Sequence, residues 1–281
     1  MKEITTEQIT QAVRDLCIKV SYDLPKDVES CLRKSLEKEE SPFGKYCLEQ
    51  IVNNAVLARD TQQAMCQDTG VAVVYVEVGQ DVHIVGGSMN QAIHEGVRQG
   101  YNDGYLRKSV CADPVFDRVN TGDNTPAVIH TEIVEGENVK ITVVPKGAGS
   151  ENMGALKMLK PTAGVEAVKQ FIIDTVNTAG GNPCPPIIVG VGIGGTMEKC
   201  AELAKEALKR EIGSKNPDAR YAALEEELLE KINKSGIGPQ GLGGRVTALA
   251  VHIEQYPTHI ATMPVAVNLN CHAARHREVI L

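Results

Sequence analysis

Apolar residues recur at intervals of three and four positions along much of the chain, which is the period of an amphipathic helix. In the first such segment Ile9, Val13 and Leu16 share one face, and Thr5 or Thr6 precedes them as a helix cap. Residues 26–40 are polar and charged, and no helix is predicted there. The segments predicted to be helices are residues 5–20, 42–59, 88–100, 162–179, 196–210 and 217–234.

Elsewhere the pattern changes to short, nearly continuous β-branched segments, which are typical of strands. Short polar turns join the first four of these segments in pairs, which predicts one hairpin from residues 71–78 and 82–85 and another from residues 127–134 and 139–144. Further strands are predicted at residues 187–193, 246–253 and 260–267. Strict βαβ alternation is absent, so the order of elements predicts an α+β fold rather than a doubly wound sheet.

Composition narrows the functional classes. The chain has 281 residues, of which 42% are hydrophobic and 23% charged, and these proportions argue against disordered and fibrous proteins. Its formal net charge of -7 argues against a nucleic-acid-binding surface. No segment approaches the about 20 apolar residues of a membrane span, and the polar N-terminal residues lack a signal-peptide pattern. We therefore expect a cytoplasmic protein that binds neither nucleic acid nor membrane.

The chain contains eight cysteines, at positions 17, 31, 47, 66, 111, 184, 200 and 271. No CxxC pair occurs, which disfavours zinc ribbons, thioredoxin-type pairs and ferredoxin-type clusters. Cys17 and Cys47 fall on apolar helix faces, so they are expected to pack in the core. If a metal binds here, its ligands come from distant parts of the sequence.

Three cysteines have a different context, because Cys66, Cys184 and Cys271 lie in loops at the ends of predicted elements. Rigid scaffolds usually present functional residues at such places. Three thiolates suit a soft metal or an iron–sulfur cluster, and three ligands for a four-iron cluster leave one iron open as a Lewis acid. The alternative is that these are ordinary, inert thiols.

Other loop residues allow two interpretations each. Asp68 is either a cap or a general acid or base, and Arg107 is either a surface cation or a clamp for a carboxylate. The glycine-rich residues 147–152 form either a plain turn or an anion-binding loop. Residues 192–196 are a weak match to a dinucleotide-binding motif. His272, in the polar C-terminal segment, is expected to be solvated.

Taken together, these loops resemble the alpha subunit of the two-subunit class I fumarate hydratases, with the L-tartrate dehydratase alpha subunit as a close relative. The resemblance extends over about residues 5–276 and implies an α+β fold of the class I fumarase N-terminal type, with helices around mixed and antiparallel sheets. It rests on the ordered set CQDTG at 66–70, LRKS at 106–109, NTGDNTP at 120–126, KGAGSEN at 146–152, CPP at 184–186, GIGGTMEKC at 192–200, GPQGLGG at 238–244 and LNCHAARH at 269–276.

The resemblance implies a 4Fe-4S cluster held by Cys66, Cys184 and Cys271, whose fourth iron coordinates substrate. It also implies a smaller beta subunit that supplies the proton-abstracting threonine, in an α2β2 assembly, so the isolated chain is expected to be inactive. Residues 1–281 are then expected to form a single alpha-subunit domain. This domain would contain a helical segment over about residues 1–62 and a mixed α+β body over about residues 63–281.

By the same resemblance, Gln67, Arg107 and Gly149 contact a small dicarboxylate substrate, and Asp68 orients it or accepts a proton. The implied reaction is the reversible hydration of fumarate to L-malate by a hydro-lyase. The alternative is dehydration of tartrate to oxaloacetate, because fumarate and tartrate enzymes share these motifs. A third hypothesis, from another class, is a non-catalytic metal-binding module that senses oxygen.

Overall fold

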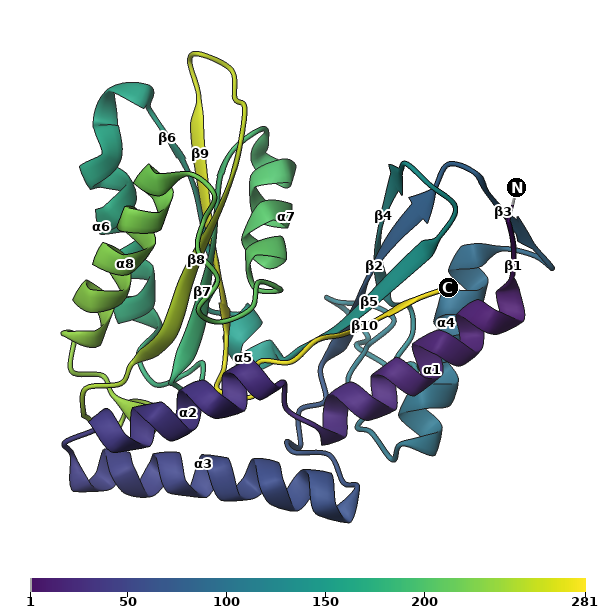
Figure 1. Ribbon diagram of the computed structural model, residues 1–281, viewed down its shortest axis with the longest axis horizontal. Coiled ribbons are helices and arrows are strands. Elements are labelled where there is room, and N and C mark those ends of the chain that lie inside the picture. The colour runs from purple at the N-terminus through teal and green to yellow at the C-terminus, as the bar shows by residue number, and fades with distance from the viewer. Residues whose placement is uncertain (1) are drawn as a thin grey trace. The chain divides into compact units, whose positions relative to one another are not determined.

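The computed structural model describes residues 2–281, and these residues divide into two compact units (Figure 1). Unit 1 contains residues 2–24, Asn54–Ala148 and Arg275–Leu281. Unit 2 contains Pro25–Asn53 and Gly149–Ala274. The single domain expected for residues 1–281 stays a prediction, because two compact units can still unfold as one.

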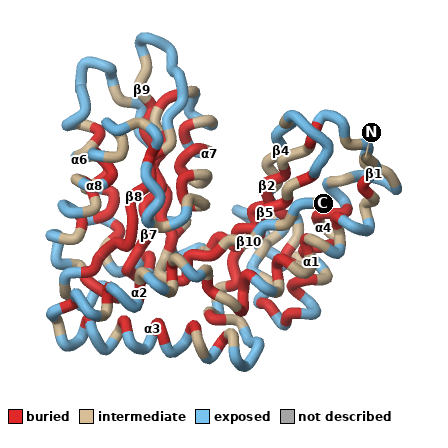
Figure 2. The backbone as a smooth tube through the Cα atoms, in the orientation of Figure 1, coloured by how far each residue is buried: buried red, intermediate tan, exposed pale blue. Residues whose placement is uncertain are grey.

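Unit 1 is built on a sheet with the strand order β10-β5-β2-β4, beside the smaller parallel pair β1-β3. Helices α1 and α4 pack on one face of the larger sheet, and their buried residues form one core with those of β2 and β5. Figure 2 marks the buried positions of these elements in red. The elements are β1 (Lys2–Thr5), α1 (Thr6–Tyr22), β2 (Val71–Gly79), β3 (Val82–Val85), α4 (Met89–Asp103), β4 (Val128–Val134), β5 (Val139–Lys146) and β10 (Arg277–Ile280).

Both predicted hairpins are wrong in their pairing, although the strands themselves form. β2 is a central strand that pairs in parallel with β4 and antiparallel with β5, so β4 and β5 lie on opposite sides of it. β3 pairs with β1 instead of β2. The physical reason is the continuous apolar character of β2, whose residues are buried on both faces and which therefore takes a neighbour on each edge.

Local sequence signals explain the two helices of unit 1. Thr5 caps α1 in a reciprocal capping box, in which its side chain accepts from the N–H of Gln8 and the Gln8 side chain accepts from the N–H of Thr5. Close packing of α1 on α4 requires a small residue, because a Cβ on Gly100 would lie 2.8 Å from the Cβ of Cys17. Cys17 is buried at this contact, as predicted.

Unit 2 is built on a sheet with the strand order β6-β9-β7-β8. Helices α6 and α8 cover one face and α7 covers the other (Figure 1). The elements are α2 (Lys26–Lys38), β6 (Ala155–Leu159), η1 (Pro161–Ala163), α6 (Gly164–Ala179), β7 (Ile187–Gly194), α7 (Met197–Ala207), α8 (Ala219–Asn233), η2 (Pro239–Gly241), β8 (Ala248–Tyr256) and β9 (Met263–Asn270). Two further helices include residues of both units, α3 (Pro42–Thr61) and α5 (Ala148–Glu151).

Glycines of β7 serve the packing of α7. Alternate residues of this strand face opposite sides of the sheet, and Val189 and Val191 belong to the core formed with α6 and α8. Gly192 faces α7, where a Cβ would lie 2.1 Å from the carbonyl oxygen of Cys200. This close approach gives Gly192, at the start of the dinucleotide-like segment, a structural role that needs no nucleotide.

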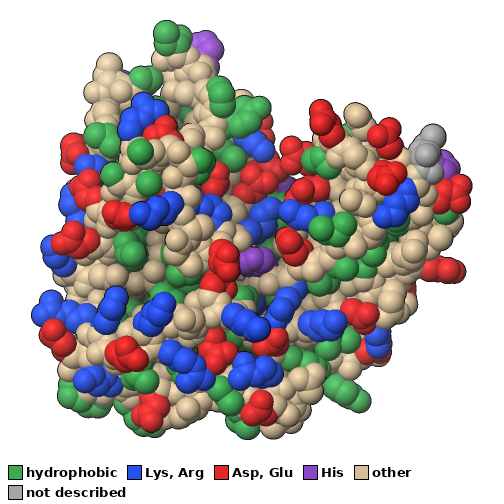
Figure 3. Space-filling view, viewed as in Figure 1, with side chains coloured by type: hydrophobic (Ala, Val, Ile, Leu, Met, Phe, Trp, Pro, Cys, Tyr) green, Lys and Arg blue, Asp and Glu red, His purple; other side chains and the backbone are tan. Residues whose placement is uncertain are grey.

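Residues 26–38 form helix α2, although the sequence pattern predicts no helix there. Val28, Leu32 and Ser35 are buried at helical spacing, and the charged residues between them obscure this short apolar face. Lys and Arg side chains gather along the helix (Figure 3).

The predicted α+β class is confirmed by the helices and the mixed and antiparallel sheets of the two units. Within residues 2–281, no helix combines the length and apolar character that crossing a membrane would require.

We expect the stability of unit 2 to fall in mild acid because of His252. Burial, followed by the charge of Arg210, lowers the pKa of His252 to about 4 from its ordinary 6.5. In the unfolded chain His252 becomes protonated below about pH 6.5, whereas in the folded chain it stays neutral down to about pH 4. The free energy of unfolding therefore decreases as the pH falls from about 6.5 to about 4. The expected loss is about 3 kcal/mol. Urea unfolding at pH values between 7 and 4 should show this decrease in the free energy of unfolding. An equal decrease in the His252→Gln variant would contradict the role of His252.

Candidate functional site

The CQDTG segment forms the loop between α3 and β2 in unit 1, and Asp68 is its most firmly held side chain. One carboxylate oxygen, Oδ1, accepts from the N–H of Gly70 at 3.0 Å, and Oδ2 accepts from the N–H of Ala148 at 2.9 Å. The side chain remains partly exposed. Asp68 is therefore a carboxylate of fixed orientation that is still open to solvent.

Cys66 is half-buried in the same loop, with its Sγ 3.5 Å from the side-chain oxygen of Gln67. The backbone before it is fixed because the N–H of Met65 donates to Ser21 at 3.0 Å and the Met65 carbonyl accepts from Asn54 at 2.7 Å. The loop thus presents a thiol, an amide and a carboxylate in consecutive positions on a firm backbone.

Arg107 belongs to a neighbouring loop of unit 1 that is tied to the CQDTG segment. Its carbonyl accepts from the hydroxyl of Thr69 at 3.0 Å. Fully buried Asn124 links the same two loops, since it accepts from the N–H of Ser109 at 2.7 Å and donates to the carbonyl of Gly70 at 3.2 Å. The Arg107 side chain is exposed and makes no ion pair within residues 2–281. It is available to bind a carboxylate from solution.

Sequence reasoning missed two further residues that hold this loop. Arg275 is buried, and its Nη2 donates to the backbone carbonyl of Asp68 at 3.1 Å. Tyr101 donates its hydroxyl to the carbonyls of Thr69 and Gly70, and burial raises its pKa so that it stays a neutral donor. The signal for Arg275 was its place in LNCHAARH, four residues after Cys271, whereas nothing near Tyr101 in sequence marked it.

In unit 2, Cys184 and Cys271 come to the same end of the sheet because of strand pairing. β7 and β9 are antiparallel neighbours in which Ile188 lies opposite Asn270, so the start of β7 and the end of β9 coincide. Cys184 precedes β7 and Cys271 follows β9. The carbonyl of Cys184 accepts from the N–H of His272 at 3.2 Å. His272 is therefore partly buried and bonded, and the expectation that it would be solvated is wrong.

Gly149 lies near the Cys184 segment of unit 2. It is exposed in the short helix α5, and a Cβ on it would lie 3.4 Å from the carbonyl oxygen of Asn182. The glycine thus leaves backbone open to solvent beside the segment that carries Cys184.

The predicted site residues therefore fall into two groups. Gln67, Asp68 and Arg107 accompany Cys66 in unit 1, whereas Gly149, Cys184 and Cys271 belong to unit 2. Across residues 2–281, no group of three or more His, Cys, Asp or Glu side chains is arranged to hold a metal ion. The ligand set and the residue roles stay predictions.

Two of the other cysteines differ from the loop cysteines in their environment, whereas Cys31, Cys47 and Cys111 are partly exposed, so Cys47 is less buried than its apolar helix face predicts. Cys17 and Cys200 are buried, and burial raises the pKa of Cys17 to about 12 and that of Cys200 to about 11. Since the thiolate is the form that binds metal, these two are poor ligands. Cys184 is exposed and Cys66 and Cys271 are partly exposed, as residues that bind an external group need to be.

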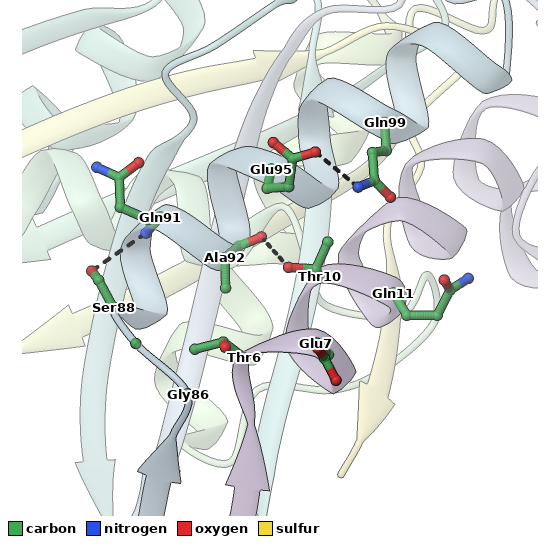
Figure 4. Close-up of a pocket in the computed structure, with 11 residues that line it drawn as sticks. Thr6, Glu7, Thr10, Gln11, Gly86, Ser88, Gln91, Ala92, Glu95 and Gln99 are labelled. Carbon is green, nitrogen blue, oxygen red and sulfur yellow. Dashed lines mark hydrogen bonds between the residues drawn. The ribbon is translucent and has the colours of Figure 1, made fainter.

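A polar cleft of about 520 Å³ lies in unit 1 at the N-terminal ends of α1 and α4 (Figure 4). Its lining groups are largely bonded to one another: Thr10 donates to the carbonyl of Ala92 at 3.0 Å, and Gln99 donates to Glu95 at 2.8 Å. None of the predicted site residues lines it, and the candidate site therefore does not include this cleft.

Comparison with known proteins identifies relatives over nearly the whole chain. The family model described as Fumarate hydratase (Fumerase) matches residues 10–280. A Methanocaldococcus jannaschii protein with the provisional name L(+)-tartrate dehydratase subunit alpha is 42% identical over 275 residues, covering 95% of each chain. The L(+)-tartrate dehydratase alpha subunits of Escherichia coli O157:H7 and of Escherichia coli strain K12 are both 34% identical over 284 residues, covering 100% of this chain and 93% of theirs.

These matches agree with the motif-based resemblance and cover 93% to 95% of the length of these relatives. The family model spans the CQDTG loop, the Cys184 segment and the segment after β9. On this basis, the chain belongs to the fumarate hydratase (Fumerase) family of hydro-lyases.

Proposed function

We propose that this chain is the cluster-binding alpha subunit of a hydro-lyase that dehydrates L(+)-tartrate to oxaloacetate. The observation that carries this proposal is its near full-length similarity, at 34% to 42% identity, to chains named L(+)-tartrate dehydratase subunit alpha. The description of the family model favours a second candidate, the reversible hydration of fumarate to L-malate. Fumarate, the first expectation from the sequence, thus becomes the second.

The donor set of the chain fits an iron–sulfur cluster. Cys66, Cys184 and Cys271 are accessible thiols on loops, and thiolates are the usual ligands of 4Fe-4S clusters.

When bound, such a cluster supplies a Lewis acid that polarises a hydroxyl and its carboxylate. Dehydration of tartrate breaks a C–H bond next to one carboxylate and the C–O bond on the neighbouring carbon. Water leaves, and the resulting enol rearranges to the ketone. In the proposal the exposed guanidinium of Arg107 binds a substrate carboxylate in a two-pronged contact.

In the proposal Asp68 contacts the substrate hydroxyl, and Gly149 leaves room for the substrate beside its backbone. Because both carboxylate oxygens of Asp68 accept backbone N–H groups, the side chain is held ready to orient a substrate hydroxyl or to accept its proton. Gly149 has no side chain, so substrate can approach its backbone closely.

The proposal includes a beta subunit, because the relatives are named alpha subunits. The base that removes the C–H proton would come from this partner, in an α2β2 complex. The chain alone would then bind the cluster without turnover.

The experiment is a comparison of substrates on the anaerobically purified complex of this chain with its beta subunit. We expect kcat/KM for L(+)-tartrate dehydration to exceed that for fumarate hydration, and we expect no turnover from the chain alone. Preference for fumarate would support the second candidate. Turnover of neither acid would refute the hydro-lyase proposal, and full activity of the chain alone would refute the shared active site.

A further inference from the structure

The GPQGLGG segment, residues 238–244, packs directly against the segment that carries Cys184. Gly181 and Gly241 meet backbone to backbone, since a Cβ on Gly241 would lie 2.6 Å from the Cα of Gly181. The N–H of Gln240 also donates to the carbonyl of Pro185 at 2.8 Å. The segment thus contacts both sides of Cys184, although no role in substrate or cluster binding has been given to it.

Gln240 connects the two cysteine segments of unit 2 through its side chain. Its Nε2 donates to the carbonyl of Pro185 at 2.8 Å and lies 3.1 Å from Nδ1 of His272. A carbonyl only accepts, so Pro185 fixes which end of the amide is the nitrogen. Nδ1 of His272 also lies 3.0 Å from the carbonyl of Cys184, so the tautomer of His272 decides whether Nδ1 accepts from Gln240 or donates to Cys184. The Gln240 side chain therefore bonds the residue after Cys184 and contacts the residue after Cys271.

A backbone contact completes the connection. The N–H of His272 donates to the carbonyl of Cys184 at 3.2 Å, so the two cysteine segments also touch each other. Gln240, His272 and the residues 184–185 form a closed set of polar contacts at the end of the sheet where Cys184 and Cys271 emerge.

The segment that carries Gln240 is anchored independently of the cysteines. Buried Glu39 accepts from the backbone N–H groups of Glu40, Ser41, Arg245 and Val246, at 2.9 to 3.0 Å. At its other end, the N–H of Gly238 donates to the hydroxyl of Thr247 at 3.0 Å.

These anchors hold Gln240 in a left-handed conformation, with φ of 56°. Such a backbone is unfavourable for a residue with a side chain, so it persists where surrounding contacts impose it. Cys184 has the same feature, with φ of 55°. The packing of the two segments therefore holds both residues in these conformations, and we take the two segments to be rigid.

We propose that Gln240 is a positioning residue, which holds the Cys184 and Cys271 segments together and so sets the spacing of two cluster ligands. This inference rests on the proposed function, because it takes these cysteines as ligands. A preformed frame avoids the entropy loss of ordering two loops on cluster binding. Loss of partners that orient metal ligands typically lowers metal affinity by about 10- to 100-fold.

The test uses two variants of the full chain in complex with its beta subunit. Gln240→Met keeps the length of the side chain and removes the donors without adding charge, and Gln240→Glu keeps the shape and replaces the donors with a charge. Gln255→Met and Gln255→Glu are the matched controls, because Gln255 is exposed on β8 of the same unit. The measurement is the anaerobic rate of cluster release to a chelator, followed by visible absorbance.

We expect cluster release about 10- to 100-fold faster in both Gln240 variants and unchanged in both controls. Faster release in Gln240→Glu alone would show an effect of charge rather than of lost donors, and would overturn the inference. Release at the wild-type rate in both Gln240 variants would also overturn it.

A second readout does not need the cluster. Hydrogen exchange of the His272 amide in the iron-free chain reports the contact between His272 and Cys184, and we expect it to be faster in both Gln240 variants. Unchanged exchange would refute the positioning role. Absence of a cluster from the wild-type complex would instead refute the proposed function, so the two failures are distinguishable.

Discussion

Replacing Cys184 with serine is expected to abolish the cluster and reduce turnover by at least about 10²- to 10³-fold, while the chain stays folded. Cys184 is exposed and its side chain fills no core position, so the loss would be of a ligand rather than of packing. Visible absorbance and iron content of the anaerobic complex measure the loss of the cluster, and its steady-state kinetics measure the loss of turnover. Cys66→Ser and Cys271→Ser should behave in the same way.

The matched control for these variants is Cys200→Ser. Cys200 is buried and its Sγ donates to the carbonyl of Gly192 at 3.1 Å, a contact that a serine hydroxyl can replace. We expect this variant to keep the cluster and the activity. Retention of the cluster in Cys184→Ser, or its loss in Cys200→Ser alone, would contradict the assignment of ligands.

Replacing Asp68 with asparagine is expected to lower kcat by about 10²- to 10⁴-fold with the cluster retained. The amide has the shape of the carboxylate but carries no charge and cannot accept a proton. It also offers one acceptor oxygen where Asp68 now serves the N–H groups of Gly70 and Ala148, which costs about 1–2 kcal/mol of stability. Steady-state kinetics and urea unfolding separate the two effects.

Asp81→Asn is the control for this change, because Asp81 is an exposed carboxylate of the same unit, between β2 and β3. It should keep wild-type kcat. A wild-type kcat in Asp68→Asn would remove Asp68 from the reaction. Loss of the cluster together with activity would assign it a structural role instead.

The sequence predicts much of the secondary structure because local periodicity reflects burial. The helix predicted over residues 5–20 appears as α1, with the expected cap at Thr5. Strand pairing is not predictable in this way, since the neighbours of β2 are chosen by its burial on both faces and not by the turn that follows it. The apolar face of α2 is too narrow to stand out among its charges.

The sequence predicts those residues of the candidate site whose side-chain type and loop context already indicate a chemical role. Cys66, Asp68 and Cys184 stand out by residue type and loop context. Asn124 and Gln240 do not, because they act through contacts with residues 54 and 55 positions away in the sequence. The identity of the substrate cannot be predicted from these motifs either, because fumarate and tartrate enzymes share them and both substrates are dicarboxylates.

The central claim is that this chain carries an iron–sulfur cluster on which a hydro-lyase reaction depends. Its most direct test is the iron and acid-labile sulfide content of the wild-type complex, purified without exposure to air. We predict about four iron and four sulfide ions per alpha chain. A complex that is purified anaerobically and contains no iron, or contains zinc in its place, would contradict the account.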